Sequence, residues 1–109
     1  MGKIKFYCVT NKEIDFIKDE NYNFGWVGQG KIPEKYLNCN TLKNIYYKEK
    51  YYSELTFHYW FWKNLLKYED NDTWIGFCQK RRYWICEGVN KTIDKKNINQ
   101  FLFKKIENN

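Results

Sequence analysis

Polar and basic residues end two apolar segments that have the pattern of buried β-strands. The tripeptide Thr10-Asn11-Lys12 closes the segment 3–10, and the pair Arg81-Arg82 follows the segment 73–78 after two residues. Guanidinium groups bind phosphate through charge-assisted, often bidentate hydrogen bonds, and ammonium groups bind it as point charges. These residue types predict a site for a phosphate-bearing ligand, provided that the two strand ends meet.

The apolar segments predict the strands that must position these residues. Residues 3–10 begin with alternation and finish apolar, which is typical of a buried strand. Residues 24–28 form a short aromatic run that ends in the loop Gly28-Gln29-Gly30. Residues 73–78 predict a third buried strand, and residues 83–86 predict a further short one.

The clearest helix is expected over residues 53–67. Ser53 has a side chain suited to an N-cap, and Glu54 suits the positive end of the helix dipole. Apolar side chains nearly surround this segment, which is typical of a buried helix. A short helical turn is expected over residues 13–18. A last helix is expected from Thr92 or Asp94 to Ile106.

The order of elements indicates an α/β fold with a mainly parallel sheet and a buried central helix, in one domain over residues 1–109. In open α/β sheets, ligands bind outside the carboxyl ends of the strands. We therefore expect Thr10-Asn11-Lys12 and Gln79-Lys80-Arg81-Arg82 to face one crevice.

The charge balance supports a second function class. The formal net charge of +6 favours anionic partners, and aromatic residues make up 21% of the chain, far above ordinary usage. If the tyrosines between residues 46 and 52 lie on the surface, they predict a basic module that binds nucleic acid or another anion without catalysis. No recognition-helix or RNA-binding signature accompanies them.

Metal chemistry finds little support in the sequence. The four cysteines form no C-x-x-C pair, and the chain has a single histidine, so no structural zinc site is expected. Asp70-Asn71-Asp72 precedes a strand and is interpreted as a turn. No cofactor is therefore predicted, because no ligands are well placed for a divalent metal. Cys8 and Cys78 are interpreted as small buried hydrophobes in a reducing compartment.

Several aromatic residues leave two interpretations open. His58 lies on an apolar helical face, where a core position and a general base are both consistent with the pattern. Tyr59, Trp60 and Trp62 are interpreted as core, with a sugar-stacking platform as the alternative.

The segment 44–84 resembles an uncharacterised domain of bacterial capsular and exopolysaccharide biosynthesis proteins, which is similar to GT-A glycosyltransferases. The resemblance spans nearly the whole chain and is specific in residues 54–83. The motifs that match that family in order and spacing are Asn44-Ile45, Glu54-Leu55-Thr56, Tyr59-Trp60-x-Trp62-Lys63-Asn64, Ile75-Gly76-Phe77-Cys78 and Arg81-Arg82-Tyr83. In addition, Thr10-Asn11-Lys12 resembles that family's Thr-His-Lys turn. The chain departs from the family at Gln79-Lys80, where the family has His-Tyr.

The resemblance implies a GT-A or Rossmann-like fold of which the chain is the N-terminal, nucleotide-sugar-binding part, truncated before the acceptor side. It implies a nucleotide-sugar ligand, a glycan or lipid-linked acceptor and a second chain that completes the fold. It also implies a cytoplasmic protein, with a peripheral position at the inner membrane as a variant. No transmembrane segment is expected.

Within this resemblance, Thr10-Asn11-Lys12 would contact the base and ribose. Arg81 or Arg82 would neutralise the diphosphate where relatives of the GT-A class use an Asp-x-Asp metal site. Glu54 would order the arginine pair or contact substrate. The alternatives are that Glu54 serves the helix dipole and that one arginine forms a structural salt bridge, for example to Glu54. No catalytic base is identified.

Overall fold

A four-stranded sheet organises the fold in the computed structural model, which describes residues 3–28 and 30–103 apart from the side chain of Tyr51. The strands are β1 (Lys3–Thr10), β2 (Tyr22–Trp26), β3 (Leu37–Asn38) and β4 (Thr73–Gln79). The helices are α1 (Glu49–Tyr52) and α2 (Leu55–Asn64), and 3-10 turns occur at Tyr46–Lys48, Leu66–Tyr68 and Ile98–Gln100.

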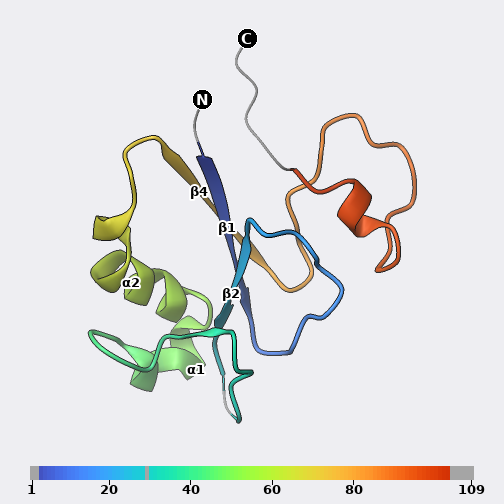
Figure 1. Cartoon of the computed structure of the whole chain (residues 1–109). Coiled ribbons are helices and arrows are strands. Elements are labelled where there is room, and N and C mark those ends of the chain that lie inside the picture. Colours follow the sequence, from blue (N-terminus) through green and yellow to red (C-terminus); the bar gives the residue numbers. More distant parts are fainter. Residues whose placement is uncertain (1–2, 29, 104–109) are drawn as a thin grey trace.

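All strands of this sheet are parallel, in the order β3-β2-β1-β4. β1 is therefore an inner strand, with β2 on one side and β4 on the other (Figure 1). The expected α/β class with a parallel sheet is confirmed. Among the described residues, no helix has the length and apolar character that a membrane span requires.

The alternating side chains of β1 pack into two separate hydrophobic cores, one on each face of the sheet. Phe6 and Cys8 pack with Ile98 and Leu102 on one face of the sheet. Tyr7 and Val9 pack on the other face, with core residues of α2 such as Phe57, Trp60 and Phe61. Successive residues of a strand point to opposite faces, so one strand supplies both cores. Burying each large apolar side chain contributes about 1.5–3 kcal/mol.

Close packing of α2 on the sheet requires a glycine in β2. A Cβ atom added to Gly25 would lie 2.2 Å from Cε2 of Phe57, whose side chain is fully buried. Glycine therefore lets the Phe57 ring lie directly against the strand backbone.

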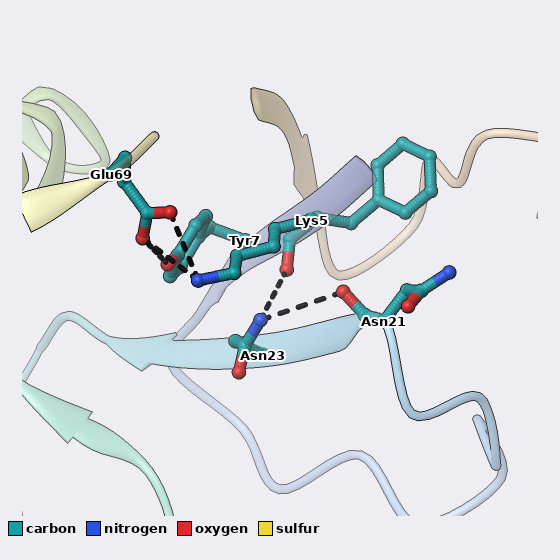
Figure 2. A network of polar contacts seen from close by, with 6 residues as sticks. Lys5, Tyr7, Asn21, Asn23 and Glu69 are labelled. Carbon is teal, nitrogen blue, oxygen red and sulfur yellow. Dashed lines mark hydrogen bonds and ion pairs between the residues drawn. The ribbon is translucent and has the colours of Figure 1, made fainter. Parts of the chain in front are cut away.

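A polar network fastens the segment after α2 to β1 (Figure 2). Lys5 Nζ contacts both carboxylate oxygens of Glu69, at 3.0 and 2.9 Å, and the Tyr7 hydroxyl donates to Glu69 Oε1 at 3.4 Å. Burial, followed by the charge and hydrogen bond of Glu69, raises the pKa of Tyr7 to about 12. The phenol thus remains a donor at neutral pH.

The expected helix over 53–67 is wrong at its start. Ser53 does not cap it, because Ser53 ends α1 with a positive φ of 47° and the next helix begins at Leu55. The helix is also not buried all round, since Leu55 and Trp62 are 55% and 57% exposed. The core interpretation holds for Trp60, which is buried, and fails for Trp62.

Two further helical expectations are wrong. Residues 13–18 form no helix, because the amide of Lys18 donates to Asn99 Oδ1 at 2.7 Å and Asn99 Nδ2 donates to the carbonyl of Phe16 at 2.7 Å. The segment is therefore bound side-on to the C-terminal part of the chain. The last helix reduces to the turn Ile98–Gln100. Its expected end at Ile106 lies outside the described residues.

Strand boundaries differ modestly from expectation. The second strand begins at Tyr22 rather than Phe24, and the strand expected over 83–86 is a single bridge between Ile85 and Leu102. The segment 34–50 contributes β3 and the start of α1.

Candidate functional site

The strand order reverses beside β1. The chain runs from β1 to β2 and β3 on one side and then returns through α1 and α2 to β4 on the other side. The loops that leave the carboxyl ends of β1 and β4 meet at Asn11 and Lys80, and the segments that follow them pack on the same face of the sheet. Such a reversal point opens a crevice where open α/β sheets bind their ligands.

A cleft of about 190 Å³ lies at this point. Residues from the ends of β1 and β4 line it, together with one residue after β2 and two from the junction of α1 and α2. The lining residues are Val9, Thr10, Asn11, Val27, Ser53, Glu54, Gln79 and Lys80.

Thr10 shapes the loop that leaves β1. Its hydroxyl donates to the carbonyl of Lys12 at 2.7 Å and accepts from the amide of Lys12 at 3.0 Å. These bonds satisfy a buried hydroxyl and close a tight turn with Asn11 at its tip. Thr10 is therefore a scaffold of the cleft. Lys12 is exposed beside the cleft and is not among the residues that line it.

Two polar pairs join segments across the cleft. Lys80 Nζ donates to Asn11 Oδ1 at 2.6 Å, which links the loops after β4 and β1. Gln79 Nε2 donates to Glu54 Oε1 at 3.1 Å, which links the end of β4 to the start of α2. A cation, a carboxylate and two amides thus converge on one small space.

Backbone strain occurs where the cleft meets α2. Ser53 has φ 47° and ψ −120°, a conformation that costs a non-glycine residue about 1–3 kcal/mol. The turn it makes directs the adjacent Glu54 into the cleft. Strained residues of this kind gather at ligand sites, where the surrounding structure holds them in place.

Arg81 and Arg82 lie in the turn that follows Lys80. The amide of Arg82 donates to the carbonyl of Gln79 at 2.9 Å, so the turn begins at a residue of the cleft. Both arginines are exposed, and neither is among the lining residues. Within residues 3–28 and 30–103, neither forms an ion pair with a carboxylate. The salt bridge to Glu54 considered from the sequence is therefore not formed.

The cleft brings together three of the six predicted site residues: Thr10, Asn11 and Glu54. Gln79 and Lys80 line the cleft, as expected from their place after the strand, although the sequence assigned ligand contacts only to the arginine pair. Gln79 is the last residue of β4 and Lys80 follows it directly, so both stand at the carboxyl end of the strand. Ser53 was missed because serine before an apolar helix is typical of an N-cap.

His58 lies near the cleft without lining it. Its ring packs on Phe77, with centroids 4.5 Å apart. Burial lowers the pKa of His58, while the charge of Glu54 acts in the opposite direction. The imidazole is therefore held neutral against an aromatic ring, which favours the core interpretation.

The Asp70-x-Asp72 pair lies at the other end of the strands. The carbonyl of Asp72 accepts from the amide of Lys3 at 3.2 Å, and that of Asp70 accepts from Thr73 at 3.1 Å. Lys3 and Thr73 begin β1 and β4, so the aspartates form the turn expected from the sequence. In the part of the chain that the structure describes, no three His, Cys, Asp or Glu residues are grouped as metal ligands.

A wider hollow of about 450 Å³ lies along β2 and β3. Its lining includes Lys18, Asp19, Glu20 and Lys35, whose charges offset one another. It flanks the strands rather than their carboxyl ends, so the reversal of strand order does not create it. The cleft between β1 and β4 is therefore the stronger candidate site.

A family model described as a domain of unknown function (DUF4422) matches residues 5–108. The chain belongs to this family. The matched range of the DUF4422 domain includes every residue that lines the cleft. No curated protein and no solved structure gives a significant match.

Proposed function

We propose that this DUF4422 domain binds the nucleotide-sugar donor of a glycosyltransferase that builds a polysaccharide or another glycan. The observation that carries the proposal is the polar cleft at the reversal of strand order between β1 and β4. In open α/β sheets, nucleotides bind in the crevice outside the carboxyl ends of the strands, at the point where the strand order reverses. On this proposal the sheet is the nucleotide-binding part of a GT-A or Rossmann-like fold.

The basic turn after β4 would bind the diphosphate. Lys80 lies in the cleft, and Arg81 and Arg82 continue the same turn at the surface. No carboxylate among the described residues neutralises either arginine. Their donors are therefore available for charge-assisted hydrogen bonds, which are about twice as strong as neutral ones. In transfer, the same cations would stabilise the nucleoside diphosphate as it leaves the sugar.

The size of the cleft indicates which part of the ligand it would hold. Its volume of about 190 Å³ is smaller than the roughly 300–1,000 Å³ of a complete small-molecule site. It suits a nucleoside, with the diphosphate and sugar extending over the basic turn. The Glu54 carboxylate would then accept hydrogen bonds from ribose hydroxyls, and Asn11 would face the base. A glycan or lipid-linked acceptor, with a second chain, would complete the site.

Calorimetric titration with nucleoside diphosphates and their sugar conjugates tests the proposal. Because each charged hydrogen bond contributes about 1.5–3 kcal/mol, we expect Arg81→Gln/Arg82→Gln to lose at least tenfold in affinity. The matched control is Lys95→Gln/Lys96→Gln, which removes two exposed charges elsewhere and should leave the affinity unchanged. Equal affinity in both double variants would contradict the role of the arginines.

The second candidate function is binding of single-stranded nucleic acid. Tyr47 and Tyr52 are exposed, and Lys48 Nζ lies 5.6 and 6.0 Å from their ring centroids. Exposed aromatic rings beside a cation are a stacking platform for bases. Tyr46 does not contribute, because it is half-buried and its hydroxyl donates to the carbonyl of Gly28. The side chain of Tyr51 lies outside the described part of the structure.

Salt dependence separates the two functions. Binding of an oligonucleotide would weaken steeply with salt, because phosphate contacts release counterions. It would also be lost in Tyr47→Ala/Tyr52→Ala. If the panel of nucleotide sugars fails to bind while the oligonucleotide binds in this manner, the nucleic-acid function replaces the donor-site proposal.

A further inference from the structure

Two cysteines face each other across the central strand pair. Cys8 of β1 and Cys78 of β4 are direct partners in the parallel register. Partners in register point their side chains to the same face of a sheet, with backbones about 4.8 Å apart. This separation lies within the Cα range of about 4.4–6.8 Å that a disulfide bond requires. The two thiols are therefore adjacent, although residues 9–77 separate them in the sequence.

The environment gives the two thiols different roles. Cys8 is fully buried, whereas Cys78 is half-buried. A hydrogen bond with Cys78 and burial both raise the pKa of the Cys8 thiol. Cys78 is thus the thiol that an external reagent meets first, and Cys8 is placed behind it as a second sulfur. A buried thiol beside an accessible one has the arrangement of a nucleophile with its resolving partner.

The other cysteines are separated from this pair. Cys39 is buried on the opposite face of the sheet and its thiol donates to the carbonyl of Trp26 at 3.1 Å. Cys86 is exposed and its thiol donates to the carbonyl of Leu102 at 3.5 Å. Cys86 therefore serves as an internal control, since it is more accessible than Cys78 and lies outside the four strands.

We propose that Cys8 and Cys78 are a reversible thiol–disulfide site that reacts with low-molecular-weight disulfides such as oxidised glutathione. The Cys78 thiolate attacks one sulfur of the reagent, whose S–S bond breaks and releases one glutathione thiolate, which takes up a proton. Cys8 then attacks the Cys78 sulfur, and its proton passes to the sulfur of the second glutathione, which leaves as a thiol. Two protein thiols are oxidised, and one glutathione disulfide is reduced to two thiols.

The bond would join β1 and β4 directly below the cleft. Cys78 precedes Gln79, and Tyr83, which packs against the same core, donates its hydroxyl to the carbonyl of Lys80 at 2.5 Å. Reversible disulfides of this kind are the ones that occur in reducing compartments.

Peptide mapping of the full chain tests the site. The protein is incubated with oxidised glutathione, quenched by acid, alkylated and digested. We expect a Cys8–Cys78 linked peptide that disappears on treatment with dithiothreitol, while Cys39 and Cys86 are recovered without a protein disulfide. Cys86→Ser should give the same linked peptide. In Cys8→Ser, Cys78 should accumulate as a stable glutathione adduct, because the resolving sulfur is absent.

Three outcomes would overturn the proposal: a stable glutathione adduct on Cys78 of the unmodified chain, a Cys78–Cys86 linkage, or four free thiols. The unmodified chain alone decides between these outcomes and the expected one, so the test survives a failure of Cys8→Ser to fold. The outcome of the peptide mapping does not depend on nucleotide binding, because the mapping detects only the state of the cysteines.

Discussion

Lys80 and Asn11 meet across the candidate cleft, with Nζ and Oδ1 2.6 Å apart, although they leave different strands of the sheet. The contact exists because β1 and β4 are parallel neighbours, which brings their carboxyl ends together. The contact therefore links the loops after β1 and β4 on the two sides of the cleft.

Removing the charge of Lys80 should weaken nucleoside diphosphate binding. In Lys80→Met the apolar stem remains, while the cation that would face the phosphates is lost. We expect an affinity loss of about 1.5–3 kcal/mol by calorimetry, since a charge-assisted hydrogen bond disappears. Lys67→Met is the control, because Lys67 is exposed at the far end of α2. A similar loss in both variants would show a general charge effect rather than a site.

Relieving the strain at Ser53 should stabilise the fold. Glycine adopts positive φ without steric cost, so Ser53→Gly should raise the free energy of unfolding by about 1 kcal/mol, after the entropy cost of glycine. Ser53→Ala retains the Cβ atom and should give no gain. Urea unfolding measures both variants, and a stability loss in Ser53→Gly would contradict the strained conformation.

Glu69 should matter more as an acceptor for Tyr7 than as a partner of Lys5. Lys5 is 42% exposed at its side chain, so the ion pair contributes below about 1 kcal/mol. Glu69→Ala leaves the buried Tyr7 hydroxyl without this acceptor, which costs about 1–3 kcal/mol.

A second substitution separates these two effects. Tyr7→Phe removes the hydroxyl that has lost its acceptor, so adding it to Glu69→Ala should recover part of the lost stability. Glu87→Ala, at an exposed carboxylate, is the control and should be nearly neutral. Strictly additive losses in the double variant would show that Glu69 does not act through Tyr7.

His58 should make the fold sensitive to mild acid. Burial lowers its folded-state pKa below the unfolded value of 6.5, so the unfolded chain binds more protons below neutrality. The stability that the neutral imidazole contributes is present above pH 6.5 and falls as the pH drops through the folded pKa.

Because the chain has one histidine, its imidazole resonance reports this pKa directly by NMR. We expect a midpoint below 6.5, and a smaller loss of stability between pH 7.5 and 5.5 in His58→Phe. A midpoint above 6.5 would show that the charge of Glu54 outweighs burial, and the predicted pH dependence would then reverse.

The sequence predicted the elements that have a single strong pattern. β1 and β4 match their expected ranges to within one residue at each end, because both are apolar runs. The expected burial is wrong for β4, which is an edge strand without a buried residue. The helical errors arose where tertiary contacts override local preference. Asn99 binds the backbone of residues 16–18, and Leu102 forms a bridge with Ile85 in place of continuing a helix.

Part of the candidate site followed from topology alone. Parallel strands put their carboxyl ends at one edge, so Thr10 and Asn11 could be expected beside the residues after β4. Which of those residues enter the cleft depends on the turn that closes between Gln79 and Arg82, and this turn carries no specific sequence signal. Lys80 therefore took the place that the sequence assigned to the arginines.

The most direct test is an NMR titration of the isotopically labelled chain with the nucleotide sugar that binds most tightly in the calorimetric panel. The account predicts amide shifts that saturate together and cluster at residues 9–12, 53–54 and 79–82. Shifts gathered around Tyr47 and Tyr52 or along the hollow beside β2 and β3 would contradict it, as would an unchanged spectrum at saturating nucleotide.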